Sequence, residues 1–337
     1  MTKPLLFAII TILKQRKENV NMSHELEIVN GVASMAYSGN VPWHGLGKKV
    51  LPDLTPEQML YEAQLDWSVE KVPAFAEVNG EKVAVGKSAL VRSSDSKVLD
   101  VVGDDWNPVQ NAEAFGFFAD FVSEGNMEMH TAGSLKGGQM VWALAKVQDE
   151  SFELFGKDRV DSYLLFSNPH QYGKSIGVRF TPTRVVCNNT LTLSLGLKSK
   201  NSVTVSHRTK FDADAVKETM GIASFKMDVY KQQAEFIANA RFTEDTKIEY
   251  LERLFPVLGE AKRKERSKAA SAVLGLLDTQ PGAEMGEGSF WQLYNGATYY
   301  VDHKMGRTDD TRMSNAWFGS GVKIKTDALD LAVEMAS

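Results

Sequence analysis

EMHTAGSLKGGQMVWALAKV, residues 128–147, places two apolar runs on either side of Lys136-Gly137-Gly138. β-Prone runs joined by a short turn that contains glycine are typical of a hairpin, because glycine readily adopts the positive φ angles of tight turns. The stretch therefore predicts strands over about 128–135 and 139–147. Tyr163–Phe166 and Ser175–Phe180 predict two more strands.

The sequence before this hairpin predicts a second set of short strands, within residues 67–102. Lys82–Val85 and Ala89–Arg92 are β-prone runs, and Gly86 separates them. Asn79-Gly80 is a strong signal for a two-residue hairpin turn, since both residues tolerate positive φ. We expect strands on both sides of this turn.

The remaining predicted elements are helices, and most lie in the second half of the chain. One begins at Thr55, where Gln58 completes a capping box, and another spans Asn111–Val122. Between Asp212 and Ala240, apolar residues step by three and four; such a seam is more often an internal core contact than a coiled coil. The last predicted elements are a helix over about 248–258, an aromatic helix from Ser289 to His303, a polar loop, and a terminal helix from Thr326.

These patterns predict an α+β fold, with a mixed or antiparallel sheet in the first half and a helix-rich second half. We expect a main domain over 22–280, a linker over 281–288 and a helical unit over 289–337 that packs on the main domain. Residues 1–21 are predicted to lie outside the fold, with Met22 as the start. A short membrane-surface anchor is the alternative for 1–21, whose apolar run is too short to span a bilayer. For 22–337 we expect no membrane contact.

The composition is that of an ordinary globular protein. The 337 residues are 43% apolar and 24% charged. Cys187 is the only cysteine, so no internal disulfide can form, which favours a reducing, cytoplasmic location. The spacing of this cysteine and the six histidines matches no zinc motif, and we expect neither a metal nor a cofactor.

The distribution of charge is uneven. The net charge is −5, which argues against a general nucleic-acid binder. From Ser162 to Phe211, however, the chain has no Asp or Glu and seven basic residues, leaving 31 of the 38 basic residues against 43 carboxylates elsewhere. The stretch is thus +7 and the rest of the chain −12.

This acid-free segment, residues 162–211, has the features of a surface that binds single-stranded nucleic acid. Cations pair with phosphates, aromatic rings stack on bases, and a carboxylate would repel the backbone. An alternative is that these cations pair with acids such as those of Glu244–Glu252. The predicted binding residues are Lys174, Arg179, Arg184, Lys198, Lys200, Arg208, Lys210 and Tyr172.

Catalytic patterns are weak, and we do not expect an enzyme. Cys187 has His170 and His207 as candidate bases, but no glycine-rich elbow surrounds it, and a free cysteine is usually a small buried hydrophobe. Asp302-His303 ends the aromatic helix, where a histidine is favoured by the helix dipole. No Walker, Rossmann, helix-turn-helix or zinc-finger pattern is present.

Four stretches together resemble the phage/plasmid-like protein family, whose domain has no assigned function. They are Val41–Gly47, Ser167–His170, Thr181–Thr190 and Trp291–His303. The resemblance implies a phage, prophage or plasmid context and supplies no reaction or catalytic residue. The positions that carry it are Trp43, His44, Asn168, Arg184, Cys187, Asn188, Asn189 and Thr190.

Three functions compete on these grounds. The first is nucleic-acid binding, in its sharpest form single-strand DNA binding or annealing during replication or recombination of a mobile element; further copies of the chain, in a homo-oligomer, are a candidate partner. The second is a protein-interaction or counter-defence module without nucleic-acid binding. The third is an enzyme on a small anionic substrate, with Arg184 and Asn188 as anchors.

Overall fold

The structure, a computed structural model, is described for most of the chain. The described residues are 27–29, 32–39, 47–124, 127–148, 151–184, 189–190, 202–205, 223–257, 266–306 and 309–337. The sequence predictions for residues 1–21 lie outside these ranges.

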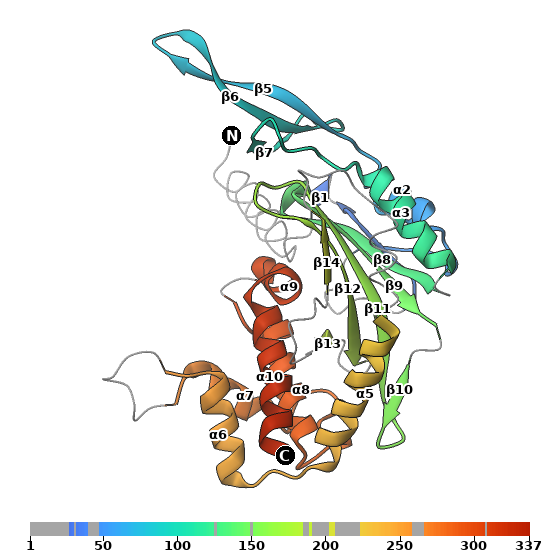
Figure 1. The fold of residues 1–337 in the computed structure, drawn as a ribbon, viewed down its shortest axis with the longest axis vertical. Helices are drawn as coiled ribbons and strands as arrows, with labels where there is room; N and C mark the ends of the chain where they lie inside the picture. The colour runs from blue at the N-terminus through green and yellow to red at the C-terminus, as the bar shows by residue number, and fades with distance from the viewer. Residues whose placement is uncertain are drawn as a thin grey trace, which may run out of the picture.

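A nine-stranded sheet forms the centre of the described fold (Figure 1). Its order is β13-β12-β11-β9-β8-β3-β4, with β10 on β11 and β14 on β12. All strand pairs are antiparallel except β3 with β4, so the sheet is mixed and the predicted α+β class is confirmed. The strands are β3 (Met35–Tyr37), β4 (Lys48–Lys49), β8 (Met127–Leu135), β9 (Met140–Val147), β10 (Phe152–Leu154), β11 (Asp158–Pro169), β12 (Ile176–Arg184), β13 (Asn189–Thr190) and β14 (Ser202–Val205). A separate pair joins β1 (Ile28–Val29) to β2 (Val32–Ala33).

The predicted 128–147 hairpin is present as β8 and β9, joined by the short helical turn η1 (Lys136–Gly138). All three turn residues have positive φ: 54° at Lys136, 63° at Gly137 and 95° at Gly138. At Gly138 a side chain is also excluded by space, because a Cβ atom would lie 2.7 Å from Nη1 of Arg92. The glycines therefore allow Lys136 to be held at the end of the hairpin.

A second antiparallel sheet extends from the body as a long ribbon (Figure 1). It contains β5 (Val69–Val78), β6 (Glu81–Arg92) and β7 (Val98–Val102), and Asn79-Gly80 forms the predicted turn with φ of 54° and 86°. The prediction of two strands separated by Gly86 is wrong, since β6 runs through it. Gly86 has a φ of 65° and lies opposite the register shift of β5, so it bends the strand without ending it.

Helices α2 (Pro56–Glu62) and α3 (Asn111–Glu124) pack on one face of the central sheet. The predicted capping box of α2 is present: Gln58 N donates to Thr55 Oγ1 (3.2 Å), and Thr55 N donates to Gln58 Oε1 (2.8 Å). From α3, the rings of Phe115 and Phe118 pack against Phe166 of β11. The apolar stripe predicted for 111–122 thus faces the core.

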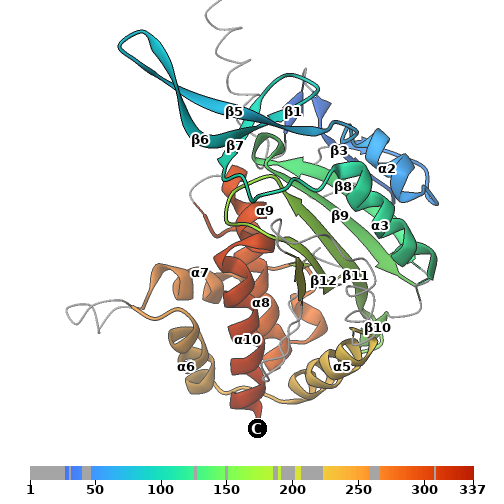
Figure 2. The ribbon, with the colours of Figure 1, turned by 45° about the horizontal axis from the view of Figure 1, so that its top comes forward.

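The second half is helical, as predicted. Figure 2 shows α8 and α10 side by side, with α5 and α6 near their lower ends and α7 beside them above α6. On α5, the seam residues Met227, Tyr230, Ala234 and Ile237 are all buried in the main core, which confirms the internal core contact; residues 212–222 lie outside the described ranges. None of the described helices has the length and apolar character needed to cross a lipid bilayer. The helices are α5 (Ala223–Asn239), α6 (Glu244–Leu254), α7 (Lys268–Leu276), α8 (Phe290–His303), α9 (Asp309–Phe318) and α10 (Ser320–Ala336), with the short turn η3 (Ala283–Met285) before α8.

The prediction of a polar loop and a helix from Thr326 at the C-terminus is wrong. The loop region forms helix α9, and α10 starts already at Ser320. Trp317 packs edge-to-face on the buried Trp142 of β9, with ring centroids 5.0 Å apart. The contact with Trp142 stabilises α9, although the polar composition of this segment is typical of a loop.

A buried hydrogen bond joins the two halves of the chain. Trp291 of α8 donates from Nε1 to Oδ2 of Asp158, the first residue of β11, at 2.8 Å. Trp142 provides a matched comparison, because its indole is equally buried and its Nε1 has no partner in the described structure.

We expect Trp291→Phe to lower the free energy of unfolding by about 1–3 kcal/mol more than Trp142→Phe. Both changes remove a buried indole, but only the first also leaves a buried carboxylate oxygen without one of its donors. Urea unfolding of the two variants measures the difference. Equal losses would show that the Trp291–Asp158 bond contributes nothing beyond packing.

Candidate functional site

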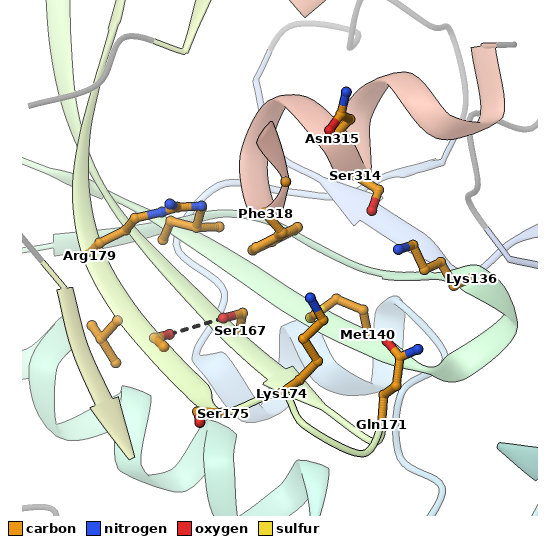
Figure 3. A pocket seen from close by; sticks show the side chains of 14 residues that line it. Lys136, Met140, Ser167, Gln171, Lys174, Ser175, Arg179, Ser314, Asn315 and Phe318 are labelled. Carbon is orange, nitrogen blue, oxygen red and sulfur yellow. Dashed lines mark hydrogen bonds between the residues drawn. The ribbon is translucent and has the colours of Figure 1, made fainter. Parts of the chain in front are cut away.

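A cavity of about 470 Å³ lies between the central sheet and helix α9 (Figure 3). Its walls come from β11 and β12, from the loop between them, from η1 and the start of β9, and from the C-terminal end of α9. More than half of its lining belongs to the acid-free segment. The lining residues are Lys136, Met140, Leu165, Ser167, Gln171, Lys174, Ser175, Gly177, Val178, Arg179, Ser314, Asn315, Phe318 and Gly319.

Among the described residues, three cations line this cavity and no carboxylate does. Lys136 comes from the η1 turn, Lys174 from the β11–β12 loop, and Arg179 from the middle of β12. Figure 3 shows the side chains of Lys136 and Lys174 extending into the space below α9. Like charges gathered without acids are costly unless solvent or a ligand compensates them, so the cavity is suited to an anion. We refer to it as the cationic pocket.

Arg179 is the most constrained of the three cations. Its guanidinium is half-buried beneath α9, with Cζ 5.6 Å from the ring centroid of Phe318. Burial lowers the pKa of Arg179 to about 10, and no carboxylate among the described residues counteracts this. The side chain is still charged at neutral pH. It therefore presents a partly desolvated positive charge to the pocket.

Asp302, an acid near Arg179, is already paired. Asp302 of α8 accepts from Nζ of the buried Lys325 at 2.8 Å. Burial is the main cause that lowers the pKa of Lys325; Asp302 opposes the shift, and the charge of Arg179 adds to it. Asp302 thus pairs with Lys325, and Arg179 forms no ion pair with a carboxylate among the described residues.

The acids of 244–252 do not neutralise Lys174 or Arg179 either. Their ion pairs are formed with other cations, all on α6 or close to it in space. These pairs are Glu244 with Lys247 (2.7 Å), Glu249 with Arg253 (3.6 Å) and Glu252 with Arg266 (3.9 Å).

The structure brings together two of the eight predicted binding residues, Lys174 and Arg179, in the cationic pocket. Tyr172 is exposed on the same loop as Lys174, and its backbone N donates to Asp100 Oδ2 (2.7 Å), but it does not line the pocket. The backbone of Arg184 pairs with Asn189 at the end of β12, and nothing is described of its side chain. Lys198, Lys200, Arg208 and Lys210 lie outside the described residues.

Sequence reasoning missed the residues that close the pocket: Lys136, Ser314 and Phe318. Lys136 was recognised only as part of a glycine turn. Ser314 and Phe318 belong to α9, which was predicted as loop. The one usable signal was the pair Trp317-Phe318, because two adjacent aromatic residues in a polar segment favour packing against a core.

The resemblance residue Asn168 is part of a buried polar network. Its Nδ2 donates to the carbonyl of Val109 (2.9 Å) and to Asn111 Oδ1 (3.3 Å), which also lies 2.9 Å from His170 Nε2. Asn111 in turn donates to the carbonyl of Leu65 (3.0 Å). These contacts tie α3 to β11, so Asn168 and His170 serve the fold. Asn189 and Thr190 form β13, whereas Trp43, His44, Cys187, Asn188 and the candidate base His207 lie outside the described residues.

A second titratable cluster lies on the sheet face that carries Arg179. Asp161 accepts from Lys146 Nζ (2.6 Å) and from Arg159 Nε (2.8 Å). Next to it, the rings of His130 and Tyr163 are 5.1 Å apart. Burial, and secondarily the charge of Lys146, lower the pKa of His130 to about 4. Within the described ranges, no three side chains of His, Cys, Asp or Glu are placed to hold a metal ion.

We expect Asn168→Ala to lower the free energy of unfolding by about 1–3 kcal/mol, because the Val109 carbonyl loses the Asn168 donor and Asn111 Oδ1 keeps only its contact with His170. Asn111→Ala should cost a similar amount, and the double variant should cost less than the sum, since both residues belong to one network. A double-mutant cycle by urea unfolding measures this. Strict additivity would contradict the network.

His130 should make the protein less stable as the pH falls from about 6.5 to 4. In that interval the unfolded chain binds a proton at His130 and the folded chain does not, which costs about 3 kcal/mol by pH 4. His130→Gln should remove this part of the pH dependence. If the free energy of unfolding of the wild type and of His130→Gln falls equally between pH 6.5 and 4, His130 is not held neutral in the folded protein.

Comparison with known proteins places the chain in one family. The match is to a domain of unknown function (DUF932), over residues 98–317. This span contains every residue of the pocket lining except Phe318 and Gly319. No curated protein and no solved structure matches the chain. With about two thirds of its length matched, the chain belongs to the DUF932 family.

Proposed function

We propose that this protein binds nucleic acid, and that the cationic pocket holds a phosphate of the strand. The observation that carries the proposal is Arg179, a half-buried cation without a carboxylate partner among the described residues, in a pocket that also contains Lys136 and Lys174. The resemblance to phage/plasmid-like proteins supports a role in the replication or recombination of a mobile element.

Phosphate suits this pocket for chemical reasons. A guanidinium offers several N–H donors in a plane, which match two phosphate oxygens at once, and lysine ammonium groups bind phosphate as point charges. Partial burial beneath α9 reduces solvent screening and strengthens each contact. Lys136, Lys174 and Arg179 reach the pocket from three different segments, so an anion would be contacted from several sides.

The net charge of the chain limits this binding to a local surface. At −5 overall, the protein repels nucleic acid except where cations are concentrated. Three phosphate contacts on a single strand would give a salt slope of about −2 in log K against log salt. Binding should therefore be weak at physiological salt unless the segments around the pocket add contacts.

A small anionic ligand is the second candidate, and the pocket volume favours it. About 470 Å³ is within the usual range for small-molecule sites. The described lining contains no Asp, Glu, His or Cys, so none of these residue types is placed there as a general base or nucleophile. We therefore formulate the second candidate as a site that binds a small anion.

Arg179→Gln should weaken the binding of a short labelled single strand by about tenfold, because it removes a charge-assisted contact. Lys174→Ala should cause a smaller loss, since this lysine is exposed. Each change should also reduce the salt slope by about 0.7. Fluorescence anisotropy across a salt series measures both quantities, and melting temperatures verify the fold.

Lys157→Ala is the matched control, because Lys157 is also exposed in a turn between strands but lies outside the pocket. Its affinity should equal that of the wild type. Equal losses at Lys157 and Lys174 would point to non-specific charge. If the wild-type protein binds no strand at low salt, the nucleic-acid proposal is wrong, and the protein-interaction function becomes the better hypothesis.

A further inference from the structure

We infer that the cationic pocket takes an unstacked base together with its phosphate, and that it thereby selects single strands. This inference rests on the proposed function and deepens it. It is carried by the lining of the pocket, which is apolar as well as cationic, and by the position of Phe318.

The apolar part of the lining is larger than phosphate binding requires. Met140, Leu165 and Phe318 contribute side chains from β9, β11 and α9. A phosphate would contact only the cations and would leave these apolar side chains exposed to water. A flat heterocyclic ring covers such a wall while its sugar-phosphate remains near the lysines, so a nucleotide uses the whole pocket.

Phe318 is held in a position to stack. Figure 3 shows its ring extending from the end of α9 into the pocket, with Arg179 to one side. The edge-to-face contact with Trp317, at 6.3 Å between centroids, fixes the ring further. A ring whose orientation is already set loses little entropy on binding, so Phe318 is suited to stack on a base that enters the pocket.

Two polar side chains are placed to contact the edge of a base. Gln171 lies on the β11–β12 loop, and Ser314 lies on the inner side of α9 with its hydroxyl directed toward the pocket (Figure 3). Neither side chain makes a hydrogen bond within the described structure. Both combine donor and acceptor capacity, which tolerates any of the four bases.

The position of the ring beneath α9 would favour single strands. The stacking ring lies between the sheet and α9, so a base must leave its neighbours to reach it. In a duplex that step breaks both stacking and pairing, whereas in a single strand it breaks only stacking. A duplex would then gain the phosphate contacts alone.

The test compares two labelled single strands that differ only in their bases. One is a normal oligonucleotide, and the other is its abasic counterpart with the same phosphates. We expect the wild-type protein to bind the abasic strand about tenfold more weakly, with an unchanged salt slope, because the phosphate contacts persist. A duplex of the same sequence should resemble the abasic strand.

Phe318→Leu keeps an apolar side chain and should bind both strands equally, at the affinity of the wild type for the abasic strand. Phe318→Trp should restore the preference for bases. Phe155→Leu, at an exposed aromatic residue outside the pocket, is the control and should behave as the wild type. Melting temperatures verify that each variant is folded. The comparison of the normal and abasic strands with the wild-type protein does not depend on any variant.

Equal wild-type affinity for the normal and abasic strands would overturn the base inference and leave phosphate binding intact. A base preference that survives Phe318→Leu in a folded protein would overturn the role of Phe318. Absence of binding to either strand removes the proposed function itself, so the two failures are distinguishable. A preference for bases that Phe318→Leu abolishes and Phe318→Trp restores supports the inference.

Discussion

The packing of helix α9 on the central sheet is the contact on which the candidate site depends. Trp317 meets Trp142 edge-to-face, with the two rings at 89° to each other. The chain then turns at Gly319, where Asn315 Oδ1 accepts from the backbone N of Ser320 (3.1 Å). Without this contact, Arg179 would point from an open sheet face into water. With it, the same residue lies in a partly covered pocket under a helix.

Enclosure changes what the charges can do. A cation in water interacts weakly with an anion, whereas a partly buried one is screened less and loses part of its own hydration. Arg179 loses part of its hydration without a carboxylate partner among the described residues, whereas the more buried Lys325 is paired with Asp302. A purely structural arginine at this depth would usually have a carboxylate or carbonyl partner of its own. Lys325 has a carboxylate partner, and the neighbouring Arg179 has none among the described residues. This difference is the main support for a ligand site.

The polar residues of the acid-free segment divide into two groups with different tasks. Asn168 and His170, near the end of β11, turn inward and secure α3 through Asn111. Lys174, in the loop that follows, and Arg179 on β12 face the opposite side, where α9 lies. Side chains alternate between the two faces of a strand, so one short segment can both anchor a helix and line a pocket.

Several parts of the fold could be predicted from the sequence because their causes are local. Glycine at positive φ defined the 128–147 hairpin and the turn at Asn79-Gly80, and the Thr55 capping box defined the start of α2. The seam on α5 showed its buried face by spacing alone. Gly86 was misread because the same residue ends a strand or bends it, and only the pairing with β5 decides which.

For the site, the sequence alone determined that a carboxylate-free, basic segment exists and that it contains Lys174 and Arg179. Which of its cations meet was decided by the tertiary structure. Lys136 joins them because β9 pairs with β11, and Phe318 joins them because α9 folds back from the far end of the chain. Local propensity carries no information about such distant contacts, because α9 gains its stability from burying Trp317 on the sheet and not from its own polar sequence.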